Sequence, residues 1–494
     1  MTKLFGWLKK YRLNFAAFVN GAVVLVTELV AVRLLSPYFG SSFFVWTSII
    51  GAILLSLSIG YWQGGKLADK TPTSKLLVMI LLTASSLLLV SVVVQRAVLG
   101  WSVGLLGGEV RVQSLVAALL LFAPANVFLG MVSPFIARLE LHRVSLTGET
   151  VGNIFAAGTV GSIVGVFLTG YVLFGLVGST RLLIAMALLC ILNTFLVDTK
   201  SLLLCRTILL VTALVLLLRP PSFKQAGFEI LADVDTAYSR YIVSNINYKN
   251  SKARILQTDL RSAQSGIDPA KPGELIFDYA KAFDIYKLWL QPKRAALIGG
   301  GASIYASHFA AQNPNSQIDV VEIDPALQQI ATQYFDFAPR PNIDLVSQDG
   351  RVFLRAAADK SYNVIFVDAY NNTSIPFQLV TRQMVEQMSR VLADDGIVVA
   401  NVISQNNPTK QQFLNAVAQT YQSVFVSLKV YRAPELAYTE GKANYILVAQ
   451  KQTTAPSPTE DAFIKQLLNR KLSLRGGGMV LTDELAPVEQ LQID

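Results

Sequence analysis

The chain has 494 residues, of which 52% are apolar and only 15% are charged. Soluble globular proteins carry about 25% charged residues, so this composition excludes a protein whose whole surface faces water, and the length predicts two or more domains. The net charge of +9 does not indicate nucleic-acid binding, because many Lys and Arg residues flank apolar segments. The cysteines, Cys190 and Cys205, and the histidines, His142 and His308, lack metal-ligand spacing, so we expect no metal site.

Long apolar segments fill residues 1–221 and predict a polytopic α-helical membrane domain. A membrane span needs about 20 largely apolar residues. Seven segments qualify, at 14–35, 43–63, 76–95, 114–137, 151–173, 180–197 and 202–218. No small-residue cleavage site flanks the first segment, so we do not expect a removable signal peptide. The last two segments are short and predict either a tight hairpin or one re-entrant segment.

Basic residues predict the orientation of these segments. They gather before the first segment, between the second and third, and between the fourth and fifth: Lys3, Lys9, Lys10, Arg12, Lys66, Lys70, Lys75, Arg138 and Arg143. The positive-inside rule therefore predicts a cytoplasmic N-terminus in the cell (inner) membrane. Seven spans would place residues 220–494 outside, where nucleosides are scarce. We favour an even number of spans and a cytoplasmic second half, with an extracytoplasmic second half as the alternative.

Several residues of the apolar half indicate packing or function. Glu28 and Arg33 lie in or at the end of the first segment, where charges point either to a functional role or to a structural pair near the interface. Gly161 and Gly165 form a GxxxG pattern that favours close helix packing. Pro124 and Pro134 are expected to break the fourth segment.

After Arg219-Pro220-Pro221, where paired prolines stop a helix, the composition becomes that of a soluble protein. Residues 239–247 and 252–259 predict a β-hairpin or small β-sheet. Strand–helix repeats follow, with apolar strands predicted at 295–298, 318–321, 343–346, 364–367 and 397–402. This alternation predicts a doubly wound parallel α/β sheet of the Rossmann type. The expected domains are 1–221 (membrane), 222–290 (β-subdomain), 291–450 (α/β) and 451–494 (tail).

Glycines or acids follow the first four predicted strands. Gly299, Gly300 and Gly301 follow the first, where they allow close approach of a ligand to the backbone, and Glu322 follows the second at a spacing typical of ribose-binding acids. Asp349 with Gly350 and then Asp368 follow the third and fourth. One acid alone could merely cap a helix. Ligands bind beyond the carboxyl ends of such strands. Glycines or acids at the ends of four successive strands therefore predict a nucleoside site.

These motifs resemble the spermidine synthase (polyamine aminopropyltransferase) family, whose catalytic half has the class I methyltransferase fold. The resemblance covers residues 226–450 through the glycine loop, Val321-Glu322-Ile323-Asp324, Gln348-Asp349-Gly350-Arg351 and Val367-Asp368-Ala369-Tyr370. The whole chain also resembles the membrane-anchored, multi-span branch of that family. The motif from Leu481 through Asp483 to Glu489 belongs to this second resemblance.

The resemblance implies a role for each motif. Glu322 would hold the ribose, and Asp349 with Gly350 the adenine, of decarboxylated S-adenosylmethionine, with the glycine loop at its tail. Asp368 would be catalytic, orienting or deprotonating the attacking amine, since an ammonium ion is not a nucleophile. Gln264, Tyr279, Tyr370 and Pro376 would contact the amine, such as putrescine. The nucleoside is a co-substrate, so no permanently bound cofactor is implied.

Three departures from the family pattern concern the polyamine end of the site. Ala302 stands where the glycine loop of the family carries an acid, Asn371 replaces a second acid after the fourth strand, and Ala280-Lys281 replaces a polar pair. A dicationic amine needs several carboxylates, because each buried charge must be compensated.

Three functions therefore stay open. They are aminopropyl transfer, S-adenosylmethionine-dependent methyl transfer to another acceptor, and a transporter or sensor with a nucleoside-binding regulatory domain. The expected partners are the lipid bilayer, a nucleoside and an amine but no nucleic acid. The sequence leaves oligomerisation open, a homo-oligomer included. Asp483 and the residues after it are expected either to close over the pocket or to form an ordinary terminal turn.

Overall fold

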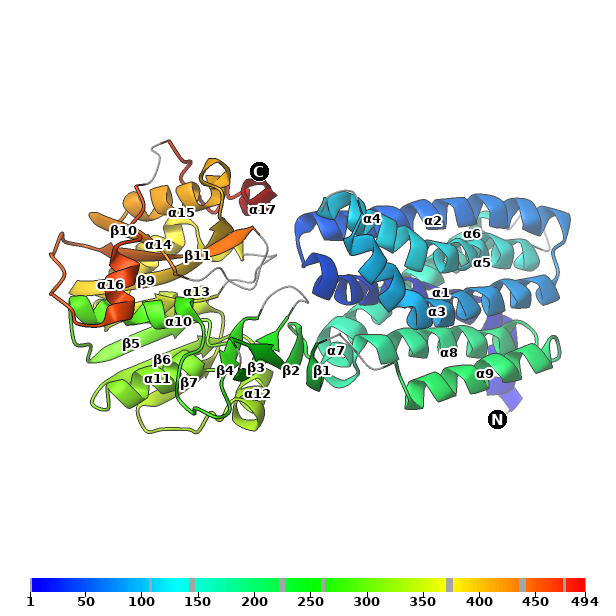
Figure 1. Ribbon diagram of the computed structural model, residues 1–494. Coiled ribbons are helices and arrows are strands. Elements are labelled where there is room, and N and C mark those ends of the chain that lie inside the picture. Colours follow the sequence, from blue (N-terminus) through cyan, green and yellow to red (C-terminus); the bar gives the residue numbers. More distant parts are fainter. Residues whose placement is uncertain are drawn as a thin grey trace. The chain divides into compact units, whose positions relative to one another are not determined.

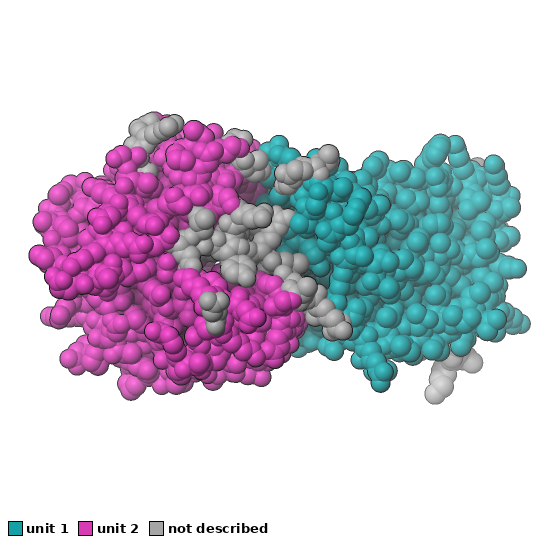
Figure 2. Space-filling view, in the orientation of Figure 1, with its two compact units in different colours: residues 1–223, 234–240 teal, residues 224–233, 241–494 magenta. Residues whose placement is uncertain are grey.

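The computed structural model describes residues 2–105, 109–141, 147–221, 227–249, 251–258, 263–369, 376–434, 441–473 and 477–493, with the side chains of residues 2–10, Thr147 and Ile493 left aside. The chain divides into two compact units (Figure 2). The first comprises residues 1–223 and 234–240, and the second comprises residues 224–233 and 241–494.

The first unit is a helical bundle (Figure 1). Its helices are α1 (Thr2–Phe39), α2 (Phe43–Lys70), α3 (Ser74–Val103), α4 (Val110–Leu121), α5 (Ala123–Glu140), α6 (Thr147–Leu168) with a π-helical turn (Thr169–Leu173), α7 (Phe174–Leu176), α8 (Ser179–Val197) and α9 (Leu203–Leu218). Within the described residues, five helices are long and apolar enough to cross a membrane, or six if the bent pair α4–α5 is one span. Helix α9 has 16 residues, which is short for a span of about 20.

The fourth apolar segment is broken, as predicted, but at one proline only. Helices α4 and α5 meet at an angle of 56°, and Pro124 lies at the start of α5. Pro134 lies inside α5 without ending it, so the prediction of a second break was wrong. A proline at the start of a helix lacks only an N–H that has no partner there, whereas surrounding helices can accommodate one in the interior.

The GxxxG pattern brings two helices into contact, as predicted. A Cβ atom on Gly161 would lie 1.9 Å from the Phe18 carbonyl oxygen, and one on Gly21 would lie 2.0 Å from the Gly158 carbonyl oxygen. Helices α1 and α6 therefore approach so closely that only glycine fits at these positions. Arg33, near the end of α1, lies 4.7 Å from the centre of the Phe174 ring and donates to the carbonyl of Ala237.

A four-stranded sheet in the order β1-β2-β3-β4 belongs mostly to the second unit. Its strands are β1 (Glu229–Asp235), β2 (Arg240–Tyr248), β3 (Ser251–Gln257) and β4 (Ser265–Ile267). Strands β2 and β3 pair antiparallel from Ile242–Gln257 to Tyr248–Ser251, which confirms the predicted hairpin.

A seven-stranded sheet in the order β10-β11-β9-β8-β5-β6-β7 forms the rest of this unit (Figure 1). Its strands are β5 (Arg294–Ile298), β6 (Gln317–Glu322), β7 (Ile343–Ser347), β8 (Tyr362–Val367), β9 (Leu392–Gln405), β10 (Ser427–Arg432) and β11 (Lys442–Gln450). Its helices are α10 (Asp278–Ala282), α11 (Ile304–Gln312), α12 (Ala326–Tyr334), α13 (Gly350–Ala356), α14 (Arg382–Val391), α15 (Gln412–Gln422), α16 (Ala462–Leu468) and α17 (Val488–Ile493), with 3-10 turns at Phe283–Leu288, Phe377–Leu379 and Pro408–Lys410.

The five predicted strands form the parallel part of this sheet, a methyltransferase-like Rossmann arrangement. Apolar side chains are buried on both of its faces, as Ala296 and Ile298 in one core and Ala295 and Leu297 in the other show. Burial on both faces explains why the strands read as continuous apolar runs. The antiparallel strands β10 and β11 were not predicted.

The strand order places the site. The chain starts in the middle at β5, adds β6 and β7 on one side and then crosses to β8 on the other. Loops that leave β5 and β8 therefore diverge at a topological switch point, where open α/β sheets bind ligands. Gly299 follows β5 and Asp368 follows β8, so the fold itself brings these two residues together.

Candidate active site

The loop after β5 is held tightly between its neighbours. Gly299 has a φ of +90°, and a Cβ atom there would lie 2.4 Å from the carbonyl oxygen of Asp368. Its N–H donates to Val321 at 2.9 Å, while the N–H of Asp368 donates to Ile298 at 2.8 Å. Only glycine combines this backbone conformation with so close a neighbour.

Glu322, at the end of β6, accepts hydrogen bonds from that same loop. Its Oε2 accepts from the N–H groups of Gly300 and Gly301, each at 3.1 Å, and its Oε1 accepts from the N–H of Asp324 at 3.2 Å. Burial raises the pKa of this carboxyl group, and the backbone donors oppose that rise. The carboxylate thus ties the β5 and β6 loops together, and its binding of a ribose stays a prediction.

Asp349 caps a helix. Its Oδ1 accepts from the N–H of Arg351 at 2.9 Å and from that of Val352 at 3.0 Å, at the start of α13. A Cβ atom on Gly350 would lie 2.5 Å from Cγ2 of Ile298, so the glycine lets α13 pack against β5. The helix-capping role is therefore present in the structure, and the adenine-binding role of Asp349 and Gly350 stays a prediction.

Asp368, which follows β8, accepts a hydrogen bond from a chain of two asparagines. Its Oδ1 accepts a hydrogen bond from Nδ2 of Asn401 at 3.0 Å, and Oδ1 of Asn401 accepts from Nδ2 of Asn444 at 2.9 Å. Both asparagines are buried. Burial raises the pKa of Asp368 to about 6, against the opposing effect of the Asn401 hydrogen bond.

Asp368 lines a pocket with residues from β4, from α10 and the segment before it, from β5 and the loop after it, and from α11. The lining residues are Ser265, Gly266, Leu275, Ile276, Phe277, Tyr279, Ala280, Leu297, Gly299, Gly300, Ile304, Tyr305 and Asp368. Four predicted site residues therefore meet here, namely Tyr279, Gly299, Gly300 and Asp368. The hydroxyl of Tyr279 donates to the backbone carbonyl of Gln264, and burial raises its pKa well above its usual value.

The remaining predicted site residues are placed less centrally. Pro376 lies before the 3-10 turn Phe377–Leu379, and its carbonyl accepts from the N–H of Leu379 at 2.9 Å. Tyr370 and Asn371, together with residues 259–262, lie outside the described residues. Lys281 forms an ion pair with Asp278 at 3.7 Å and is not among the described residues that line the pocket.

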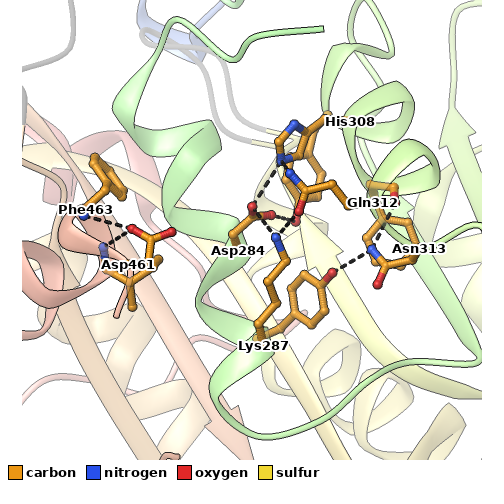
Figure 3. Close-up of polar contacts among 11 residues, drawn as sticks. Asp284, Lys287, His308, Gln312, Asn313, Asp461 and Phe463 are labelled. Atoms are coloured by element: carbon orange, nitrogen blue, oxygen red, sulfur yellow. Dashed lines mark hydrogen bonds and ion pairs between the residues drawn. The ribbon is translucent and has the colours of Figure 1, made fainter. Parts of the chain in front are cut away.

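Tyr305, on α11, is a pocket residue that the sequence did not indicate. Its hydroxyl donates to Oδ1 of Asp284 at 3.1 Å. Oδ2 of Asp284 lies 3.0 Å from Nε2 of His308 and 2.7 Å from Nζ of Lys287 (Figure 3). Burial acts to raise the pKa of Asp284, but the contacts with His308 and Lys287 outweigh it and hold the pKa below its usual value. This cluster fixes the Tyr305 ring in the pocket wall.

Asn401 and Asn444 were missed as well. A signal was present, because both asparagines interrupt apolar runs that form buried strands, where an unpaired amide would be costly. In the β9–β11 pairing, Asn401 lies opposite Ile446, so Asn444 lies diagonally across from Asn401 and can reach it. That register could not be read from the sequence without the two strands that were not predicted.

The C-terminal tail contacts the unit beside Asp349. Asp483 forms a two-pronged ion pair with Arg351, with Nη1 and Oδ1 2.8 Å apart. Leu481 is buried and accepts from the N–H of Arg382 at 2.8 Å, and Thr482 and Leu485 exchange backbone hydrogen bonds. This is the terminal turn among the two expected arrangements, and the described tail residues are not among those that line the pocket.

Comparison with known proteins finds relatives for this part of the chain. Residues 275–457 match the family described as the spermine/spermidine synthase domain. A polyamine aminopropyltransferase of Vibrio vulnificus is 34% identical over 147 residues, which cover 29% of this chain and 48% of the relative. The chain thus spans about half the length of this curated relative.

Two further similarities involve a methyltransferase and a solved structure. The human eEF1A lysine and N-terminal methyltransferase is 26% identical over 320 residues, covering 53% of this chain and 43% of the relative. The crystal structure of a probable spermidine synthase from Corynebacterium glutamicum has 20% sequence identity and a TM-score of 0.43, covering 54% of this chain and 99% of that chain. The matched residues 275–457 include Tyr279, the glycine loop, Glu322, Asp349 and Asp368, whereas the four-stranded sheet precedes them.

Proposed function

We propose that this chain is a spermidine synthase-like aminopropyltransferase. The observation that carries the proposal is Asp368, a carboxylate of raised pKa that lines a pocket beside the glycine loop of a spermine/spermidine synthase domain. Decarboxylated S-adenosylmethionine is the proposed donor and an amine the acceptor. Glu322 and Asp349, which lie at the ends of the neighbouring strands, are the proposed contacts to the nucleoside.

The chemistry needs a proton acceptor in the pocket. The amine arrives as an ammonium ion and becomes a nucleophile only after it loses a proton. A carboxylate attracts the ammonium ion, and a pKa raised to about 6 makes it a better base than an ordinary aspartate while leaving it ionised at neutral pH. The amine nitrogen then bonds to the carbon beside the sulfonium, the carbon–sulfur bond breaks, and methylthioadenosine leaves with the electron pair on its sulfur.

The direct experiment uses the full-length protein in detergent or lipid, with decarboxylated S-adenosylmethionine and a panel of amines. Aminopropyl transfer releases methylthioadenosine, which chromatography quantifies. We expect release that depends on both the amine and Asp368. Failure of the folded protein to bind either decarboxylated S-adenosylmethionine or methylthioadenosine would overturn the proposal.

Methyl transfer is the second candidate, and Ala302 is the observation that favours it. The Ala302 side chain is fully buried at the position where the family carries an acid, so that charge is missing beside the glycine loop. The loss removes repulsion toward the carboxylate that S-adenosylmethionine retains. S-adenosylhomocysteine would be the product in this case, and the same chromatography separates it from methylthioadenosine.

We also propose that the helical unit lies in the inner membrane and that the second unit faces the cytoplasm, where donor nucleosides are available. Support for the bilayer comes from the helices themselves, since the Gly148–Leu176 span is only 22% buried and exposes Phe155, Ile163 and Phe167. Large apolar side chains exposed in this way are expected to face lipid.

A further inference from the structure

The pocket has a single charged side chain among the described residues that line it. It belongs to Asp368, which is ionised at neutral pH. The other polar side chains are the hydroxyls of Ser265, Tyr279 and Tyr305. The segments 259–262 and 370–375, outside the described residues, contain by sequence one acid, Asp259, and one base, Arg261, whose formal charges cancel.

Other acids of the same region have partners of their own. Asp284 contacts His308 and Lys287, and Asp278 pairs with Lys281. The position of Ala302 offers no charge, and its N–H donates to the hydroxyl of Ser265 at 3.3 Å. Among the described residues that line the pocket, Asp368 is therefore the counter-ion for a ligand.

The rest of the wall is apolar and aromatic. The rings of Phe277 and Tyr279 stack with centres 6.1 Å apart and planes 19° apart. Both lining tyrosine hydroxyls already donate to protein acceptors, Tyr279 to Gln264 and Tyr305 to Asp284. The attraction between a cation and an aromatic face offsets only part of the free energy that the cation loses when it is dehydrated on burial. These rings therefore do not replace a second carboxylate.

We infer that the acceptor is a monoamine, with one ammonium group and an apolar alkyl or arylalkyl body, in preference to a diamine. The inference rests on the proposed function and names its substrate class. The single ammonium group binds Asp368 and gives it a proton, and the apolar body lies against Phe277, Tyr279 and Tyr305. The nitrogen then takes the aminopropyl carbon, methylthioadenosine leaves, and the remaining protons stay on the product as a secondary ammonium ion.

Butylamine and putrescine test the inference, because they share a four-carbon chain and differ by one ammonium group. The full-length protein is given decarboxylated S-adenosylmethionine with each amine, and kcat/KM is measured from methylthioadenosine release. We expect butylamine to exceed putrescine by about tenfold or more, since the second ammonium group of putrescine would be buried without a counter-ion. A phenylalkylamine is expected to be used at least as well as butylamine.

Ala280 allows the charge to be restored. It lines the pocket and is only partly buried, so Ala280→Asp adds a second carboxylate with little disturbance of the core. We expect this variant to shift the kcat/KM ratio toward putrescine by about tenfold, whereas the uncharged Ala280→Asn leaves the ratio near that of the parent. Thermal unfolding confirms that both variants fold.

The outcomes separate the inference from the proposed function. Aminopropyl transfer with putrescine preferred would overturn the monoamine acceptor and leave the aminopropyltransferase intact. Release of methylthioadenosine with none of the amines, by a folded protein that binds the nucleoside, would overturn both. An unchanged ratio in Ala280→Asp would show that carboxylate supply does not set the preference.

Discussion

Asn401 donates a hydrogen bond of 3.0 Å to Oδ1 of Asp368, and it is held in that orientation by Asn444. Because the Asn401 carbonyl already accepts from Asn444, its amide nitrogen must face the carboxylate. One oxygen of Asp368 is therefore occupied, and the other is left to act on a ligand in the pocket. The two asparagines are buried positioning residues and are not among the described residues that line the pocket.

Activity is expected to fall as the pH drops through about 6. Asp368 is the proposed base and works only when ionised, and burial raises its pKa from the usual range to about 6. Below that pH the protonated carboxyl group can no longer accept a proton from the amine. The acid limb of the kcat/KM profile measures this pKa directly, and a limb centred near 4 would show that Asp368 is not the titrating group.

Replacing Asn401 should move that acid limb to higher pH. The hydrogen bond from Asn401 favours the ionised form of Asp368, so Asn401→Leu is expected to raise its pKa by about one unit. Asn444→Asp should act in the same direction, since a carboxylate at 444 would attract the Asn401 amide and turn its carbonyl toward Asp368.

Ser404→Ala is the matched control for these asparagine variants. Ser404 lies on the same strand, is also buried, and its hydroxyl has no hydrogen-bond partner among the described residues. The control should leave the acid limb in place. A limb that moves equally in all three variants would indicate general loosening of the sheet and contradict the positioning role.

Asp368→Asn should abolish turnover while nucleoside affinity stays within about tenfold, because the amide cannot accept the proton but keeps the shape of the side chain. Calorimetry gives the affinity, and methylthioadenosine release gives the turnover. Surviving turnover would remove Asp368 from the mechanism.

Gly299→Ala should destabilise the second unit by about 3 kcal/mol or more, since the new methyl group meets backbone atoms that cannot move independently of the sheet. Gly273 provides the comparison. It too has a positive φ, of +85°, but nothing lies within 4 Å of a Cβ atom there, so Gly273→Ala isolates the backbone strain of about 1 kcal/mol. Denaturant unfolding measures both, and equal losses would contradict the close approach of Asp368.

The terminal turn should loosen when its ion pair is removed. Arg351 holds the pKa of Asp483 below its usual value, so the pair contributes stability at neutral pH that is lost as the pH falls toward that lowered pKa. The pair is partly exposed, so Asp483→Asn should cost only about 1 kcal/mol. Limited proteolysis of the tail should become faster, whereas Glu484→Gln, at the exposed neighbouring acid, should leave the rate unchanged.

The sequence predicted the parallel strands and their loops because burial on both faces leaves unbroken apolar runs that glycines and acids punctuate. It failed at β10 and β11, although the latter is buried along almost its whole length. A last antiparallel pair lacks the alternating helix that marked the earlier strands. Asp349 shows a further limit, since capping and ligand binding require the same residue at the same place, and the structure confirms only the first.

Contacts within the helical unit indicate at which end of the bundle the chain leaves it, which the number of candidate spans alone does not. If the bent pair α4–α5 counts as one span, and α6 to α7 as another, each span reverses direction relative to the one before it. Arg138 near the end of α5 accordingly pairs with Asp69 near the end of α2 at 3.3 Å. At the other end of the bundle, Arg96 donates to the carbonyl of Pro221 at 2.7 Å, and the N–H of Ser179 donates to Asp235 at 2.7 Å. The chain therefore leaves the bundle at the end opposite its N-terminus, so α9 runs the length of the bundle despite its 16 residues, and we expect it to act as a seventh span.

We accordingly expect tags on the N- and C-termini to report opposite sides of the membrane. An even number of spans, which the sequence favoured, would place both tags on one side of the membrane. Tags accessible from the same side would therefore contradict α9 as a seventh span. The donor nucleoside requires a cytoplasmic C-terminal tag, whereas the basic residues near the N-terminus favour the reverse orientation. A C-terminal reporter that is active only outside the cytoplasm would place the pocket away from its donor and overturn the proposed aminopropyl transfer. A reporter that is active in the cytoplasm would show that the basic residues do not set the orientation of this chain.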